Sequence, residues 1–115
     1  MRMATMNMSE VRARAEFANI KAEVYDRGDY VEVKFDAHGK TVCEAIRCMR
    51  NMINLIRCPF KLSVIHGFHN GQAIMTAIRA EFCSTRINRL YTDFWNPGIT
   101  HFWVDGDSYI LSYSA

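Results

Sequence analysis

The sequence predicts an α/β fold, a two-layer α/β sandwich with a β-α-β-α-β-β core and an added N-terminal helix. Two observations predict it. Residues 31–35 alternate apolar and polar side chains, residues 62–65 form a mainly apolar run, and both segments end in His-Gly before a stretch with helical periodicity. A strand, a crossover helix and a second strand are typical of a parallel pair. We therefore expect His38 and His66 at the same edge of the sheet.

The first residues predict a helix behind a short tail. Residues 1–8 carry one charge and no apolar segment, and we expect a flexible N-terminus there. Residues 9–28 predict the N-terminal helix, with Gly28 as its stop. Its thin apolar stripe consists of Val11, Ala15, Ala18, Ala22 and Tyr25, helped by Phe17 and Val24. A stripe so rich in alanine predicts either a lid on the domain or a contact with a protein partner.

We assign residues 29–115 to one domain, which begins with a strand at 31–36 that has one buried face. Thr41 and Glu44 form a capping box that begins a helix after Gly39, and Pro59 ends it. The run at 62–65 predicts a central strand covered on both faces. The later elements are a helix at 71–82, a strand at 86–95, a type II turn at 96–98, a strand at 99–104 and a short strand at 109–113.

Composition excludes several classes of protein. Half of the residues are apolar, which argues against disorder, and no apolar run approaches the roughly 18 residues of a membrane span. The start of the chain lacks the apolar segment of a secretory signal, so we expect a cytoplasmic setting and no membrane contact. Reduced thiols rather than a metal site are expected, because no C-x-x-C pair occurs among Cys43, Cys48, Cys58 and Cys83.

Positive charge is concentrated in the middle of the chain. The net charge is +2, but residues 40–92 carry eight Lys and Arg against two Asp and Glu. Such charge on the crossover helices and their loops is typical of a domain that meets phosphate groups. A solvated helix face is the alternative explanation, and charge alone favours it.

Four short motifs occur in a fixed order: Asp-Ala-His-Gly at 36–39, Thr-Val-x-Glu-Ala at 41–45, Ile-His-Gly-x-x-x-Gly at 65–71 and Pro-Gly-Ile-Thr at 97–100. Together they resemble the small MutS-related (Smr) domain, and the resemblance extends from Val31 to Val104. It implies a compact β-α-β-α-β-β fold similar to the C-terminal domain of translation initiation factor three. It also implies binding of DNA or RNA, which several members of the family nick.

The resemblance implies roles for individual residues. Asp36, His38 and Gly39 match the D-x-H-G element of the family, which is implicated in cleavage or in shaping the site. His66 with Gly67 matches its H-G element, and Gly71 matches the last glycine of its glycine-rich loop.

Three positions depart from the family pattern. Phe68 stands where the family usually has a lysine, His69 where it has a glycine, and Ile74 where a helix arginine is common. The intact Asp36 and His38 favour an enzyme, whereas Phe68 and Ile74 favour a domain that binds without cleaving.

The candidate catalytic residues are Asp36, His38 and His66. Phosphodiester cleavage needs activation of a nucleophile, for which an imidazole can act as base or acid. A carboxylate can orient the imidazole or hold a divalent cation, Mg²⁺ or Mn²⁺. No ligand spacing is diagnostic of a metal, so no metal site is assigned. The alternative is that both histidines bond to neighbouring backbone and hold the two loops.

The candidate nucleic-acid-binding residues follow the His-Gly pairs or lie on the first crossover helix. They are Gly39, Lys40, Arg47, Arg50, Gly67, Phe68, His69 and Gly71. Glycine amides and helix N-termini can receive phosphate. Phe68, Trp95 and Trp103 are candidates for stacking on unpaired bases, although the place of Trp103 in its strand favours the core.

The sequence thus favours a nucleic-acid-binding domain with endonuclease activity on DNA or RNA. One alternative is a non-catalytic DNA- or RNA-binding module. The other is a protein-interaction domain that uses its N-terminal helix.

Overall fold

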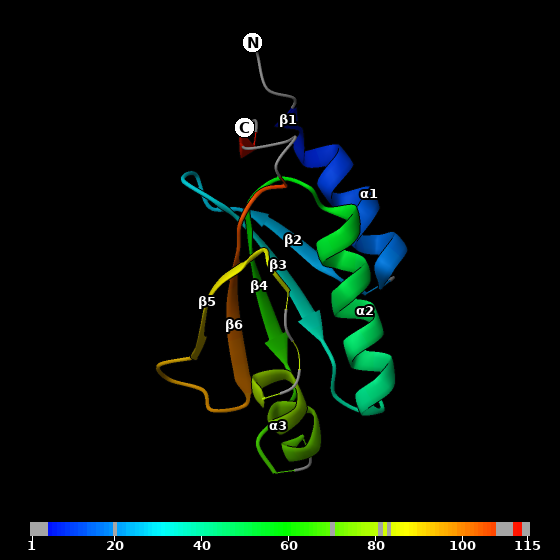
Figure 1. Ribbon diagram of the computed structural model, residues 1–115, viewed down its shortest axis with the longest axis vertical. Coiled ribbons are helices and arrows are strands. Elements are labelled where there is room, and N and C mark those ends of the chain that lie inside the picture. The colour runs from blue at the N-terminus through cyan, green and yellow to red at the C-terminus, as the bar shows by residue number, and fades with distance from the viewer. Residues whose placement is uncertain are drawn as a thin grey trace.

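In the described part of the chain, three helices pack on one face of a five-stranded mixed sheet and form the two-layer α/β fold that the sequence predicts (Figure 1). The computed structural model describes residues 5–19, 21–69, 71–80, 82, 84–107 and 112–113. The helices are α1 (Met8–Ala18), α2 (Val42–Leu55) and α3 (Gln72–Ala80). The strands are β1 (Thr5–Met6), β2 (Glu23–Asp26), β3 (Val31–Asp36), β4 (Phe60–Ile65), β5 (Ile87–Thr92), β6 (Ile99–Val104) and β7 (Ser112–Tyr113).

The larger sheet has the strand order β2-β3-β4-β6-β5. β3 and β4 are parallel, and the other neighbouring pairs are antiparallel. The predicted parallel pair is confirmed, with Asp36 opposite Ile65 in the register. The Ala37 N–H extends the pairing by donating to the Ile65 carbonyl at 2.8 Å. His38 and His66 consequently leave the sheet at the same edge, as the sequence predicts.

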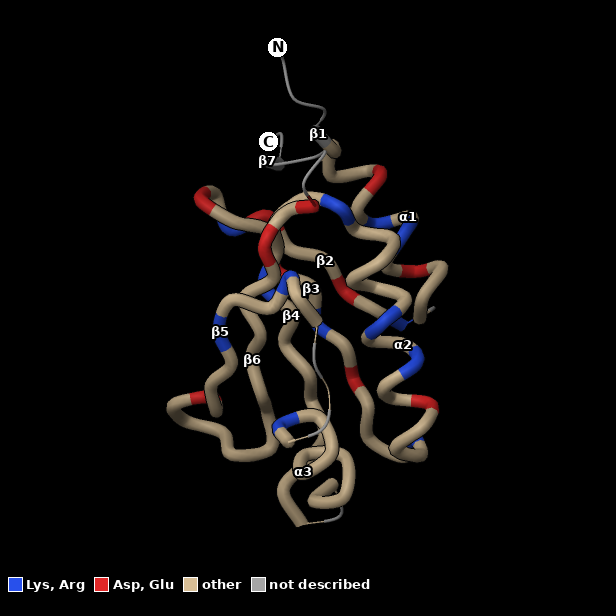
Figure 2. The backbone as a smooth tube through the Cα atoms, viewed as in Figure 1, with Lys and Arg blue, Asp and Glu red and all other residues tan. Residues whose placement is uncertain are grey.

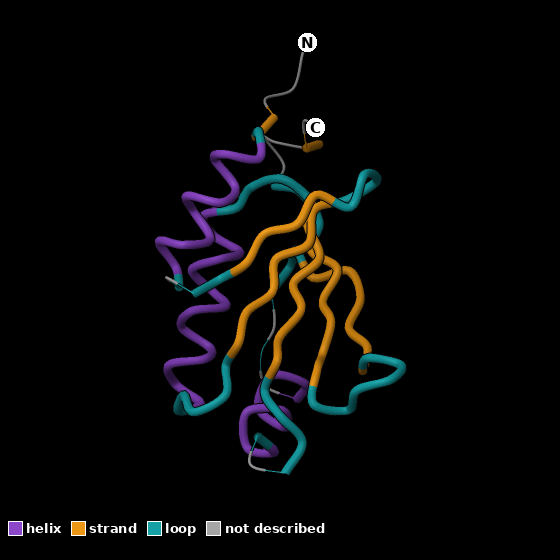
Figure 3. Tube along the Cα trace, turned by 180° about the vertical axis from the view of Figure 1, so that it is seen from behind, coloured by secondary structure: helices purple, strands orange, loops and turns teal. Residues whose placement is uncertain are grey.

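The helices cover one face of this sheet only. The core lies between that face and the helices, and Phe35, Leu62, Phe102 and Met49 are fully buried in it. Figure 3 shows the opposite face, where no helix lies over the strands. β4 is the central strand, as predicted. On the helix-free face it is covered by side chains of the neighbouring strands, which bury Ser63.

The expected helix at 9–28 is wrong beyond its third turn. It ends at Ala18, and residues Glu23–Asp26 form β2, which pairs antiparallel with β3. Val24 and Tyr25 suit a strand, and Gly28 takes a φ of +89° in the turn between β2 and β3. The alanine stripe misled the prediction because helical spacing continues to Ala22, past the true helix end.

Residues 5–8 of the expected flexible N-terminus also have defined places. Thr5 and Met6 form β1, which pairs in parallel with β7. Met6 is 1% exposed, and the Arg57 N–H donates to its Sδ at 3.3 Å. Burial of this apolar side chain explains the difference from the prediction. Residues 1–4, and residues 109–111 of the expected last strand, lie outside the described residues.

The apolar stripe of α1 faces the domain itself. Val11 and Ala15 are fully buried, and Arg14 Nη1 donates to the Leu55 carbonyl at the end of α2, at 2.7 Å. α1 therefore packs on its own domain, which agrees with the first of the two alternatives that the stripe predicted.

Several other boundaries agree closely with the prediction, but the turn at 96–98 is not of type II, because Gly98 lacks the positive φ that this turn type requires. Thr41 and Glu44 make the expected capping box of α2, and β6 has the expected bounds. α2 ends at Leu55, ahead of Pro59. β5 stops at Thr92 because the Asp93 carboxylate accepts hydrogen bonds from two amides of the following turn. Within the described ranges, every helix is too short or too polar to cross a membrane.

Candidate functional site

A cleft of about 790 Å³ lies at the sheet edge where β3 and β4 end. Its walls are the loop between β3 and α2, the loop between β4 and α3, and the first turns of both helices. This is the lower end of the molecule in Figure 1. Most of the predicted site residues line it together, namely His38, Gly39, Lys40, His66, Gly67, Phe68, His69 and Gly71.

Glycines shape both loops of the cleft. Gly39 and Gly67 have φ angles of +80° and +83°, a region that side chains disfavour. Gly71 is required for a different reason, because a Cβ there would lie 1.7 Å from the carbonyl oxygen of His66. The start of α3 is thus pressed against the His66–Gly67 backbone.

Asp36 and His38 form a hydrogen-bonded pair on the rim. Asp36 Oδ1 lies 2.6 Å from His38 Nδ1 and also accepts from the His38 backbone N–H at 3.1 Å. An ionised carboxylate only accepts, so Nδ1 carries the proton and Nε2 is the nitrogen that can meet a ligand. The His38 side chain is 75% exposed. Asp36 itself lines a separate hollow of about 210 Å³ and is not among the described residues that line the cleft, whereas His38 lines both.

His66 occupies a different environment from His38, because it is 1% exposed and both ring nitrogens have protein partners. Nδ1 lies 2.7 Å from the Gly67 carbonyl oxygen, and Nε2 lies 2.9 Å from Thr100 Oγ1. A carbonyl only accepts, so Nδ1 carries the proton and Nε2 accepts from the Thr100 hydroxyl. Burial lowers the pKa of His66 and outweighs the opposing effect of the Gly67 carbonyl. The neutral ring holds the β4–α3 loop against β6.

Arg79 and Thr100 complete this cluster, and sequence reasoning assigned no role to either. Arg79 Nε and Nη2 both donate to Thr100 Oγ1, at 3.0 and 2.9 Å. The Thr100 oxygen therefore accepts from the guanidinium while its hydroxyl proton goes to His66. The Pro-Gly-Ile-Thr motif was the available signal for Thr100, but nothing local marked Arg79.

Two helix N-termini face the cleft. Thr41 and Val42 at the start of α2 line it, as do Gly71, Ala73 and Ile74 at the start of α3. The first amides of a helix lack intrahelical acceptors, and the helix dipole adds partial positive charge at this end. The cleft wall is therefore favourable to an anion.

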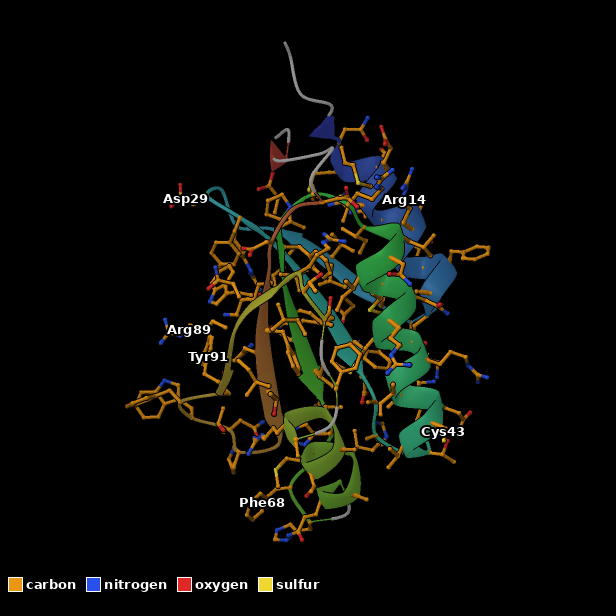
Figure 4. The ribbon with its side chains drawn as sticks, viewed as in Figure 1. Arg14, Asp29, Cys43, Phe68, Arg89 and Tyr91 are labelled. Carbon is orange, nitrogen blue, oxygen red and sulfur yellow. The ribbon has the colours of Figure 1, made fainter. Side chains whose placement is uncertain are left out.

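Phe68 projects from the β4–α3 loop. Its side chain is 45% exposed and meets the His69 ring edge to face, with centroids 5.4 Å apart. Figure 4 shows Phe68 and Cys43 at the same end of the molecule, from this loop and from the first turn of α2.

Arg47 and Arg50 do not line the cleft, although the sequence grouped them with it. Both are exposed on α2, and the Arg50 guanidinium lies 5.9 Å from the Phe82 ring, beside a separate hollow. Figure 2 shows the Lys and Arg positions spread along α1 and α2. The described lining residues include Lys40 and three histidines but no carboxylate.

A second polar cluster lies on the helix-free face of the sheet, and sequence reasoning missed it. Ser63 Oγ donates to Glu32 Oε2 at 2.6 Å and lies 2.8 Å from His101 Nδ1. His101 Nε2 in turn lies 2.6 Å from Asp93 Oδ1. Glu32, Ser63 and His101 are all buried, beside a hollow of about 200 Å³. The one signal was a serine within the apolar run of β4.

The expected stacking residues occupy three different environments. Trp103, expected in the core, is half-buried on the helix-free face and meets Tyr30 edge to face at 5.0 Å. Trp95 is 86% exposed in the turn between β5 and β6. Only Phe68 lines the cleft among these three residues.

Within the described ranges, no group of three or more His, Cys, Asp or Glu side chains is arranged to hold a metal ion. Asp36 and His38 form a pair without a third such group.

The fold and the cleft define a two-layer α/β domain with a loop-lined cleft at the ends of two parallel strands. No family model, curated protein or solved structure matches this chain. The resemblance to the Smr domain therefore stays a prediction, which depends on the motifs alone.

Proposed function

We propose that this domain binds DNA or RNA by receiving a backbone phosphate in the cleft between the β3–α2 and β4–α3 loops. The observation that supports this most is the convergence of two helix N-termini on a cleft with Lys40, His38 and no carboxylate among its described lining residues. Amides at helix starts and in glycine loops are suited to phosphate oxygens. Lys40 adds a full positive charge at the same wall.

The state of His66 favours binding over cleavage. A general base must reach the proton that it takes, but both nitrogens of His66 are engaged by Gly67 and Thr100 inside the protein. We assign His66 the structural role of holding the Gly67 and Phe68 loop in place. This is the alternative that the sequence left open.

Phosphodiester hydrolysis is a second candidate function, and the Asp36–His38 pair favours it. Asp36 fixes the imidazole with the proton on Nδ1, which leaves His38 Nε2 able to take a proton from a water molecule. The water oxygen would then attack the phosphorus while the bond from phosphorus to the leaving oxygen breaks. The carboxylate stabilises the imidazolium that forms.

Binding is tested by measuring the affinity for labelled duplex DNA, single-stranded DNA and single-stranded RNA over a range of salt concentrations. Lys40→Ala should weaken binding regardless of sequence and lower the slope of log affinity against log salt by about 0.9 on duplex DNA. Arg47→Ala is the matched control, since it removes an exposed charge from α2 outside the cleft. Equal losses for the two variants would move the contact to α2 and overturn the proposed site.

Cleavage is tested on supercoiled plasmid and labelled RNA with Mg²⁺, with Mn²⁺ and with chelator. Activity that His38→Ala removes and that His69→Ala retains would support the second candidate. Binding without cleavage under every condition would leave the first candidate alone.

A further inference from the structure

Two aromatic side chains stand out from the turn between β5 and β6. Phe94 and Trp95 are 85% and 86% exposed, and their rings meet edge to face with centroids 4.8 Å apart. Exposing two large rings forgoes the burial that normally stabilises such side chains. A ligand that contacts the two rings would restore this burial.

The turn that carries them is held firmly. Asp93 Oδ2 accepts from the amides of Trp95 and Asn96 at 3.0 and 2.9 Å, while Asp93 Oδ1 bonds to His101. The Gly98 amide donates to Asn96 Oδ1 at 2.8 Å. These bonds fix the backbone at both ends of the turn, so the exposed rings do not result from a loosely attached loop.

The same turn is joined to the cleft. The Gly98 carbonyl accepts from the amides of both His66 and Gly67, at 2.9 and 3.0 Å. A Cβ on Gly98 would lie 3.0 Å from the Gly67 Cα, so the two backbones are in close contact. Figures 1 and 3 both show the β5–β6 turn at the same end of the sheet as the β4–α3 loop.

The most exposed apolar side chains of the β5–β6 turn and of the β4–α3 loop are aromatic, and Leu90 on β5 is 36% exposed. Phe68 on the cleft wall adds a third ring to Phe94 and Trp95. Exposed rings beside the proposed phosphate site are suited to an unpaired strand, because every base offers a flat face for stacking.

We propose that Phe94 and Trp95 stack on unpaired bases of a single strand whose backbone enters the adjacent cleft, which makes single-stranded DNA or RNA the ligand class. The inference rests on the proposed function, since the cleft supplies the phosphate contact. It adds a second contact, on a different loop, that a base-paired duplex cannot use.

Tryptophan fluorescence tests the contact directly. Trp95 and Trp103 are the two tryptophans of the chain, so Trp103→Phe leaves Trp95 as the reporter. This variant is titrated with a single strand of about 12 nucleotides, with the corresponding duplex and with an abasic strand of the same length. The base-bearing single strand should quench Trp95 and bind most tightly, because the other two probes offer no free base.

Affinity gives an independent readout. Trp95→Ala should weaken single-strand binding by about 5- to 150-fold, the range for loss of one stacked base. Phe17→Ala is the matched control, since it removes a ring that is 84% exposed on α1. It should leave the affinity unchanged.

The outcomes separate the two proposals. Equal binding of the abasic and base-bearing strands, with no change at Trp95, would overturn stacking while the phosphate site stands. Unchanged affinity of a Phe94→Ala/Trp95→Ala double variant would also overturn stacking. Failure of all three probes to bind would overturn the proposed function, and the stacking inference with it.

Discussion

His101 Nε2 lies 2.6 Å from Asp93 Oδ1, and this bond connects a buried histidine of β6 to the residue that follows β5. The hydrogen bond from His101, with those from the Asn96 and Trp95 amides, lowers the pKa of Asp93. Because Asp93 also fixes the turn that carries Trp95, the buried network and the exposed rings share one carboxylate.

Asp93→Asn should lower the stability at neutral pH. A carboxylate with a lowered pKa stabilises the fold above its unfolded pKa of about 3.9, and this contribution is lost as the pH falls toward the lower folded value. The difference in free energy of unfolding between wild type and variant should therefore shrink below pH about 4. Urea unfolding at several pH values measures it, with Glu16→Gln as a surface control. A difference that stays constant with pH would contradict the assignment.

Ser63→Ala removes the hydroxyl that links two buried groups. Burial acts to raise the pKa of Glu32, but hydrogen bonds from Ser63 and Arg27 lead to a lowered pKa. Without the hydroxyl, Glu32 and His101 each lose a partner, which should cost about 1–3 kcal/mol of unfolding free energy. Ser9→Ala on α1 is the control and should change the unfolding free energy little. A neutral effect of Ser63→Ala would contradict the stabilising role assigned to the hydroxyl.

His66 should titrate below the ordinary histidine pKa of about 6.5. Its stabilising contribution is then fully present above that pH and is lost as the pH falls through the lower folded pKa. NMR signals of the imidazole, identified by their absence in His66→Gln, report the midpoint. The unfolding free energies of wild type and His66→Gln should also converge at acidic pH. A midpoint at or above the ordinary value would refute the buried, neutral state.

Gly71→Ala should destabilise the domain more than Gly67→Ala does. The new methyl at position 71 would meet the His66 carbonyl oxygen at 1.7 Å, so backbone must move, and we expect a loss of about 2 kcal/mol or more. At Gly67 a Cβ meets nothing within 4 Å, and only the positive φ costs energy, about 1–2 kcal/mol. Denaturant unfolding of both variants ranks them. The reverse order would mean that α3 is not pressed against the loop.

Local patterns were sufficient to predict the centre of this fold. Two strands that each end in His-Gly before a helix predicted the parallel pair, and the Thr41 capping box placed the start of α2. The N-terminal region could not be predicted in this way, because Ala22 continues a helical stripe while Val24 and Tyr25 pair with β3. A strand next to a hairpin turn is selected by its partner, not by its own periodicity.

The sequence was sufficient to predict which loops form the candidate site, but not the burial and partners of its side chains. The glycines and histidines identified the two loops of the cleft. Whether a histidine is buried or exposed depends on partners that are distant in sequence, and Thr100 lies 34 residues from His66. The Ser63–His101 contact spans 38 residues, so no short motif could reveal it.

The parallel pairing of β1 with β7 determines from which side the domain can be attached to a surface or a label. Residues 5–6 and 112–113 lie side by side at the end of the molecule away from the cleft (Figure 2). A dye attached to a residue of β1 or of β7 would therefore lie at that same pole. A domain immobilised through either strand would therefore keep its cleft on the side that faces the solvent.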